Sequence, residues 1–201
     1  MIQFNRPLIL ASGSPRRREL MQTLGLPFQV LVSDADESFP PGLQPVQVPA
    51  LLSRRKAEAV FRLRPDALVL AADTVVDLGG TILNKPAHAE EARHMLGILS
   101  GQTHFVHSAY TLLSDKKVIT RTDTASVRIR VLQEAEIGFY VASGRPFDKA
   151  GSYGIQDWIG LVAVEAIDGS FFTVMGLPTH RLWSDLAEWE ESENGTSRPI
   201  V

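Results

Sequence analysis

The stretch Leu68-Val69-Leu70-Ala71-Ala72-Asp73-Thr74 decides the fold more strongly than any other part of the sequence. It opens with an unbroken apolar run that is too short for a typical helix. Such runs are typical of strands buried on both faces of an α/β sheet. The run ends on the carboxylate of Asp73, and open α/β sheets bind their ligands outside the carboxyl ends of strands. We therefore expect a strand that delivers Asp73 to a functional site.

The residues that follow have the pattern of a hairpin. Gly79-Gly80 separates two apolar segments and favours a two-residue turn. Such a turn pairs Leu78 with Thr81, and the continued register brings Lys85 opposite Thr74. The hairpin would then set a cation beside the carboxylate of the preceding strand, which suits a phosphate and metal site.

Bulk composition excludes several classes of protein. The chain has 201 residues, enough for one substantial core, and a formal net charge of -3. That charge gives no general attraction to nucleic acid. The sequence has no cysteine, which excludes disulfides, thiolate metal sites and cysteine nucleophiles. The N-terminal residues lack a signal-peptide layout and no apolar run approaches the length of a membrane span, so we expect a cytoplasmic protein without membrane or nucleic-acid partners.

Periodicity and end signals predict the other elements of a single α/β domain over residues 1–201. Strands are expected over 7–11, 28–32, 105–113 and 118–131, and a second hairpin over 161–167 and 170–174. Helices are expected from an N-cap at Ser14 to Gly25, and over 50–63, 89–99, 134–143 and 179–189. The polar residues 190–201 are expected to fray.

Three arginines, Arg16-Arg17-Arg18, fall in the first turn of the first expected helix, directly after Ser12-Gly13-Ser14-Pro15. The helix dipole disfavours cations there by a few tenths of a kcal/mol each. An anion bound between these arginines and the free N–H groups would explain the pattern. A solvated basic face explains it equally well, and this stretch alone does not decide.

Two further segments carry groups suited to a nucleotide. Asp34, Asp36 and Glu37 cluster carboxylates that suit Mg²⁺ or Mn²⁺, although an ordinary acidic loop is the simpler explanation of that cluster alone. The segment 147–156 is rich in small residues, which let backbone approach a ligand; Lys149 in it could meet phosphate and Gln156 could read a base edge. Other groups gain no role from their local sequence alone: Lys56 sits in a basic run that can be plain surface, and His104 and His107 are assigned no zinc.

Taken together, the motifs resemble those of the Maf family of nucleotide pyrophosphatases, in order from about residue 8 to 186. The matching stretches are Leu10-Ala11-Ser12-Gly13-Ser14-Pro15-Arg16-Arg17, Glu37, Lys56-Ala57, Ala72-Asp73-Thr74, Asn84-Lys85-Pro86, Leu99-Ser100-Gly101-Gln102-Thr103-His104, Asp148-Lys149-Ala150-Gly151-Ser152-Tyr153-Gly154-Ile155-Gln156 and Met175-Gly176-Leu177-Pro178.

The resemblance implies an elongated α/β fold with a central mixed twisted sheet flanked by helices, two lobes around a cleft, and kinship with inosine triphosphate pyrophosphatases. It also implies frequent homodimers and hydrolysis of a nucleoside triphosphate between the α and β phosphates. The ending Tyr153-Gly154-Ile155-Gln156 is similar to the branch that acts on dTTP and UTP, whose specificity positions correspond to Arg16, Thr74 and Gln156. Two positions depart from the pattern: Asp157, followed by Trp158, stands where glycine is usual, and Ser152 where alanine is commoner.

The resemblance supports a mechanistic hypothesis. Asp73 acts as the general base or metal-anchoring carboxylate, Glu37 helps hold Mg²⁺ or Mn²⁺, and a metal-activated water attacks the α phosphorus in line. The residues expected to neutralise phosphate charge or contact the nucleotide are Ser12, Arg16, Lys56, Thr74, Lys85, Lys149 and Gln156.

Three other function classes stay open. The first is a pyrophosphatase for inosine or xanthosine triphosphates, and the second is a non-catalytic nucleotide-binding regulator linked to cell division. A pure binder needs no base, so the carboxylates and lysines of the motifs argue against the regulator. The third class, a nucleic-acid binder, is disfavoured by the net acidity.

Overall fold

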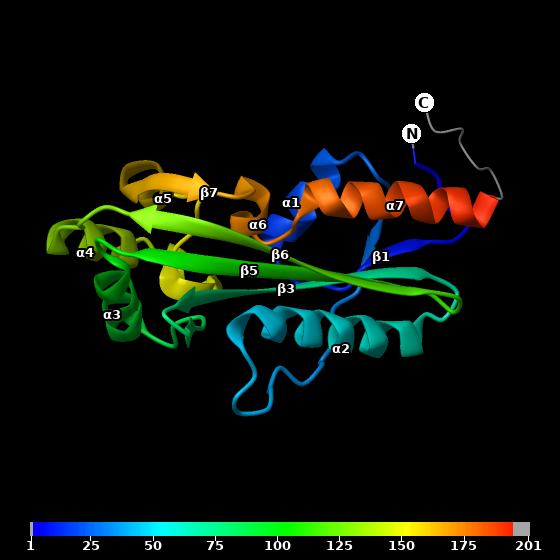
Figure 1. Ribbon diagram of the computed structural model, residues 1–201, viewed down its shortest axis with the longest axis horizontal. Coiled ribbons are helices and arrows are strands. Elements are labelled where there is room, and N and C mark those ends of the chain that lie inside the picture. Colours follow the sequence, from blue (N-terminus) through cyan, green and yellow to red (C-terminus); the bar gives the residue numbers. More distant parts are fainter. Residues whose placement is uncertain (1, 195–201) are drawn as a thin grey trace.

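The computed structural model describes residues 2–194, which form an elongated molecule built on one mixed seven-stranded sheet (Figure 1). The strand order is β2-β1-β3-β5-β6-β7, and β4 pairs with β3 outside this path. The strands are β1 (Leu8–Leu10), β2 (Gln29–Val30), β3 (Leu68–Leu78), β4 (Thr81–Leu83), β5 (Thr103–Leu113), β6 (Val118–Ile129) and β7 (Val164–Asp168). β1 runs parallel to β2 and β3, whereas all other neighbours are antiparallel, so the prediction of a central mixed sheet is confirmed.

Helices cover both faces of the sheet (Figure 1). They are α1 (Pro15–Thr23), α2 (Val48–Leu63), α3 (Ala89–Leu99), α4 (Glu134–Ala142), α5 (Trp158–Ala163), α6 (Phe171–Met175) and α7 (Thr179–Asn194), with short 3-10 helices η1 (Pro45–Gln47), η2 (Arg145–Asp148) and η3 (Ala150–Ser152). None of the helices in residues 2–194 combines the length and apolar content that a membrane crossing needs.

The two faces of β3 bury different cores because successive side chains of a strand point in opposite directions. On one face, α1 and α7 pack over the first half of β3 and the second half of the antiparallel β5, and α3 and α4 pack over the other half of each strand. The opposite face of β3 packs against α2 through Val69, Ala71 and Val75. The prediction that this segment is buried on both faces is confirmed.

β3 does not end at Asp73, as the apolar run had suggested, but continues through Val75 and Val76 to Leu78. β1 pairs with residues 68–70 and β4 with residues 76–78 on the same edge. Among the strands that the structure describes, neither covers residues 71–75 on this edge. Asp73 and Thr74 therefore lie in a gap between two strands rather than beyond a strand end.

Several local predictions are confirmed. Leu78 pairs with Thr81 across the Gly79-Gly80 turn. Both helical boundaries of α3 agree with the sequence, and its apolar positions Ala92 and Leu96 are fully buried.

The predicted second hairpin is wrong. Residues 158–163 form α5, and residues 171–175 form α6 with Ser170 as its N-cap. The structure keeps one strand of this region, β7, which covers residues 164–167 of the first expected strand and pairs with β6. Ile159 and Ala163, four residues apart, are both buried, which is a helical spacing that short apolar segments conceal.

The sequence predicts that Thr179 caps the last helix and that Leu182, Trp183, Leu186 and Trp189 form its packing face, and the structure differs in part. Leu182, Leu186 and Trp189 are buried, whereas Trp183 is 39% exposed because it points away from the i, i+4, i+7 stripe. The helix continues to Asn194, so residues 190–194 are helical rather than frayed. Thr179 is its first residue, not its cap. The remainder of the expected frayed tail, residues 195–201, lies outside the described residues.

His104 on β5 makes stability depend on pH. Its Nε2 atom is 2.8 Å from the hydroxyl of Tyr153, and its Nδ1 atom is buried without a partner. Burial lowers the pKa of His104 from 6.5 to about 4. Between these pH values His104 is protonated in the unfolded chain but stays neutral in the folded chain. The free energy of unfolding therefore falls as pH drops from 6.5 to 4.

We expect His104→Gln to remove this dependence. Urea unfolding at pH 7.0 and at about pH 4.5 should show a stability loss in the wild type that exceeds that of the variant by up to about 3 kcal/mol, at about 1.4 kcal/mol per pH unit. Equal losses in the two proteins would contradict the assignment.

Candidate functional site

A cleft of about 600 Å³ opens where β3 is left uncovered between β1 and β4. Its walls come from the β1–α1 turn, the loop before α2, α2 itself, β3, the segment after β4, and the stretch from η2 to Gln156. All nine residues that the sequence nominated line it: Ser12, Arg16, Glu37, Lys56, Asp73, Thr74, Lys85, Lys149 and Gln156.

Lys56 on α2 is held between two carboxylates. Its Nζ atom lies 2.6 Å from Asp73 Oδ1 and 2.7 Å from Glu37 Oε1. The hydrogen bond from Lys56 lowers the pKa of Glu37, and the charges of Lys85 and Arg17 lower it further. Asp73 points toward α2 because it shares a face of β3 with the α2-packed residues. The basic run on α2 thus contributes one lysine to the site.

Thr74 points to the opposite face of the sheet. Its hydroxyl lies 2.8 Å from that of Ser108, its ladder partner on β5. Ser108 donates its hydrogen to the carbonyl of Thr173, so Thr74 donates to Ser108. Two adjacent residues of β3 therefore serve two sides of the cleft.

Arg17 is the residue whose role the sequence did not single out. Its guanidinium donates to the hydroxyls of Ser12 and Thr74, at 3.3 and 3.0 Å, and to the carbonyl of Gly176 at 2.9 Å. Burial lowers the pKa of Arg17, and the charge of Asp73 opposes that shift. Its position three and four residues before the buried Leu20 and Met21 is a helical signal that could have marked it as inward-facing.

The start of α1 differs from a standard cap. Ser14 occupies the predicted N-cap position, but its side chain makes no capping hydrogen bond. Its backbone N–H instead donates to the hydroxyl of Ser12, at 3.3 Å. Ser12 thus joins the first turn of α1 to the buried guanidinium of Arg17.

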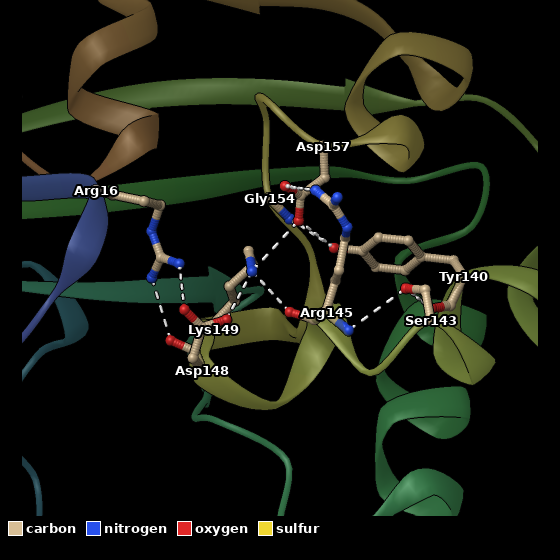
Figure 2. Close-up of polar contacts among 8 residues, drawn as sticks. All are labelled: Arg16, Tyr140, Ser143, Arg145, Asp148, Lys149, Gly154 and Asp157. Atoms are coloured by element: carbon tan, nitrogen blue, oxygen red, sulfur yellow. Dashed lines mark hydrogen bonds and ion pairs between the residues drawn. The ribbon is translucent and has the colours of Figure 1, made fainter. Parts of the chain in front are cut away.

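Arg16 and Lys149 share the carboxylate of Asp148 (Figure 2). Arg16 donates to Asp148 Oδ2 at 2.7 Å and to its carbonyl at 3.1 Å. Lys149 donates to Asp148 Oδ1 and to the carbonyl of Arg145, both at 2.6 Å. Burial opposes ionisation of Asp148, but the hydrogen bond from Lys149 and the charge of Arg16 outweigh it and lower its pKa. In this structure, both cations are paired with protein groups.

Lys85 reaches the cleft from outside the sheet. The β3–β4 ladder ends at the pair Val76 and Leu83, so Lys85 is not the ladder partner of Thr74 that the continued register predicted. It lies two residues beyond β4, is exposed, and faces the site closely enough for its charge to act on Glu37.

The two unusual positions in the last motif both have defined contacts. Asp157 is buried, and its carboxylate accepts a hydrogen bond from the hydroxyl of Tyr140 at 2.7 Å. Ser152, fully buried with a positive φ of 62°, donates from its hydroxyl to the sulfur of Met95 at 3.0 Å. Neither Asp157 nor Ser152 is among the residues that line the cleft.

Glu37 and Asp73 fit a divalent cation of the Mg²⁺ type. Within the described part of the chain, no three His, Cys, Asp or Glu side chains gather as a ready ligand set. Mg²⁺ needs no such set in phosphate chemistry, because one or two carboxylates and the substrate's phosphates commonly hold it. Two carboxylates that converge on one ammonium group have the donor chemistry for this arrangement.

Comparison with known proteins gives consistent relatives. The sequence profile of the family described as Maf-like protein matches residues 7–189. A dTTP/UTP pyrophosphatase of Thermus thermophilus is 48% identical over 89% of this chain and 92% of its own length. Another, of Salinibacter ruber, is 46% identical over 92% of both chains. Among solved structures, the Staphylococcus aureus Ham1 protein aligns with a TM-score of 0.45 and 14% identity, covering 62% of this chain and 72% of its own.

The family profile spans nearly all of the described chain, and several relatives exceed 40% identity over about nine-tenths of it. This chain therefore belongs to the Maf family.

Proposed function

We propose that this protein hydrolyses dTTP and UTP to the nucleoside monophosphate and pyrophosphate. The observation that carries the proposal is the double ion pair of Lys56 with Glu37 and Asp73 in the cleft. A protein that only binds nucleotide needs no pair of acids around a lysine, whereas hydrolysis needs a base and a cation at the reacting phosphate. Relatives named dTTP/UTP pyrophosphatase support the choice of substrate.

The chain's own residues divide the work. Asp73 accepts a proton from the attacking water, and Lys56 and Lys85 neutralise charge on the phosphates. Arg16 and Lys149 bind phosphate oxygens in place of Asp148. Ser12 and Arg17 form part of the cleft wall. Glu37 and Asp73 would hold Mg²⁺ or Mn²⁺, which supplies charge neutralisation and a more acidic water when bound.

Thr74 and Gln156 are proposed to contact the base or orient the nucleotide. Gln156 is exposed in the cleft and presents both a donor and an acceptor. Arg16, which also lines the cleft, completes this set. A pyrimidine offers a matching edge with both kinds of group.

The test is pyrophosphate release from dTTP, UTP, CTP, 7-methyl-GTP, dITP and XTP, each with Mg²⁺, Mn²⁺ or EDTA. Metal-dependent turnover of dTTP and UTP, with monophosphate as co-product, is the expected result. Turnover of dITP or XTP alone would favour the inosine or xanthosine alternative. No turnover of any nucleotide would favour a regulator that binds nucleotide without hydrolysing it.

Lys85→Ala is expected to lower kcat about a hundredfold while metal dependence is retained, because the lysine neutralises phosphate charge and is not a metal ligand. Steady-state rates across a Mg²⁺ titration check this. A variant that needs much more Mg²⁺, yet reaches the wild-type rate, would assign Lys85 to metal affinity instead.

We also propose that the chain works as a single domain, in the cytoplasm, as a homodimer, in keeping with the family resemblance. Light scattering on the purified protein tests the dimer directly. Wild-type mass at the monomer value across working concentrations would reject it.

A further inference from the structure

The turn that presents Gln156 to the cleft has a defined geometry. The backbone N–H of Asp157 donates to the carbonyl of Gly154 at 3.0 Å, which closes a turn of four residues. Gln156 is the third of these residues and is exposed, whereas the flanking Ile155 and Asp157 are buried. The position of Gln156 is therefore set by what holds the two ends of this turn.

One hydroxyl holds both ends. Tyr140 on α4 is fully buried and accepts a hydrogen bond from the N–H of Gly154, the first residue of the turn, at 3.2 Å. The same hydroxyl donates to Asp157 Oδ2, on the last residue of the turn, at 2.7 Å. Figure 2 shows Tyr140 reaching both residues from the helix side.

Asp157 has two cationic partners besides Tyr140. Its carboxylate lies 3.3 Å from Lys149 Nζ and 3.5 Å from Arg145 Nη1. Burial and the hydrogen bond to Asp157 raise the pKa of Tyr140, so its hydroxyl keeps the proton that it donates. A buried carboxylate with this many partners is fixed in place, because loss of a partner leaves charge uncompensated.

Close packing leaves the turn little room to move. A Cβ atom on Gly154 would lie 2.6 Å from Asp157 Oδ2 and 2.7 Å from Lys149 Cε. A Cβ atom on Gly160, in α5, would lie 2.1 Å from the carbonyl oxygen of Ile155. The backbone of Gly154 is thus packed against the side chains of Asp157 and Lys149, and the carbonyl of Ile155 is packed against α5.

We propose that Tyr140 and Asp157 are positioning residues for base recognition, which act through the 154–157 turn to hold Gln156 in place for the nucleotide base. Neither side chain touches substrate in this role. The proposal rests on the proposed function in so far as the nucleotide is the ligand of the cleft. It adds a set of residues behind the cleft wall that sets specificity without contacting the reacting phosphates.

The chain offers a matched control for this pair. Tyr110 on β5 is also fully buried and donates to Asp185 Oδ2 at 2.6 Å. Asp185 on α7 is as buried as Asp157 and pairs with Arg121 at 3.2 Å. Neither Tyr110 nor Asp185 lines the cleft, so their variants measure what loss of a buried tyrosine–aspartate bond does to stability alone.

The test compares Tyr140→Phe with Tyr110→Phe on the full chain. Both variants keep the ring, and both should lower Tm by similar amounts. Tyr140→Phe should raise KM for UTP and dTTP, and Ki for UMP, about tenfold, whereas kcat and Ki for pyrophosphate should stay within about twofold. Tyr110→Phe should leave all four constants within about twofold.

Asp157→Asn and Asp185→Asn extend the comparison. Asp157→Asn should raise KM at least as much as Tyr140→Phe, and the double variant should add little, because both changes release the same turn. Asp185→Asn should change stability and leave KM unaltered. If the effects of Tyr140→Phe and Asp157→Asn on KM were additive in the double variant, the two residues would not act through the same turn.

Hydrogen exchange gives a readout that does not need turnover. The N–H groups of Gly154 and Asp157 should exchange faster in Tyr140→Phe than in the wild type, and at the wild-type rate in Tyr110→Phe. If the wild-type protein hydrolyses no nucleotide, the proposed function has failed. The positioning role is then tested by hydrogen exchange and by the affinity for UMP measured by calorimetry. Wild-type exchange at these two amides, an unchanged KM, or a parallel rise in Ki for pyrophosphate would each overturn the proposal.

Discussion

Replacing Asp73 with asparagine is expected to lower kcat at least about a thousandfold, because general-base and electrostatic contributions of one side chain lie at about 10²–10⁴ and this carboxylate is proposed to combine both. Asparagine has nearly the same shape, and its amide oxygen can still accept the hydrogen bond from Lys56, which Asp73 accepts at 2.6 Å. The fold should therefore persist, with Tm within a few degrees of the wild-type value. Pyrophosphate release under saturating UTP and Mg²⁺ measures the loss.

Asp77→Asn is the matched control for this change. Asp77 lies on the same strand and the same face as Asp73, and contacts His107 and the Gly80 N–H outside the cleft. It should keep kcat within about twofold. Near-wild-type turnover by the Asp73 variant would remove Asp73 from the mechanism, whatever its stability.

Lys56→Met is expected to lower kcat at least about a hundredfold. Methionine keeps much of the length of the side chain but loses its charge, which leaves Glu37 and Asp73 without the ammonium group that lies 2.6–2.7 Å from both. The wild-type pKa of Glu37 is lowered chiefly by the hydrogen bond from Lys56. Loss of this hydrogen bond should raise the pKa of Glu37, so the acidic limb of the pH–rate profile should move to higher pH.

Arg54→Met on the same helix separates this effect from a general loss of charge on α2. Arg54 pairs with Glu58 on the exposed surface, and such pairs contribute little to stability. Its kcat and pH profile should match the wild type. A Lys56 variant with a large rate loss but an unmoved acidic limb would place the lysine against phosphate alone and not in control of Glu37.

Sequence predicts most strongly where the determinants are local. The Gly79-Gly80 turn and the caps of α3 are set by neighbouring residues, so register and boundaries agree with the structure. Residues 164–167 form a strand as predicted, whereas residues 161–163 and 171–174 are helical, because a few apolar residues fit either a strand or a helical turn.

The site shows the same division between local and distant determinants. Ordered motifs were enough to nominate the nine residues that line the cleft. The ion-pair partners were not predictable, because Arg16 meets Asp148 across 132 positions of sequence and Lys149 meets Asp157 only through a fold of the loop. The buried contacts of Arg17 with Ser12, Thr74 and Gly176 likewise depend on how α1 docks.

The length of β3, β5 and β6 has a mechanical consequence. These strands have 11, 11 and 12 residues and run beneath both the α1–α7 core and the α3–α4 core. Nine ladder pairs join β3 to β5 and eleven join β5 to β6, so the two halves of the molecule share one continuous hydrogen-bonded sheet. A hinge across this sheet would break ladder hydrogen bonds, so we expect any closure around a nucleotide to come from the loops and side chains at the rim of the cleft.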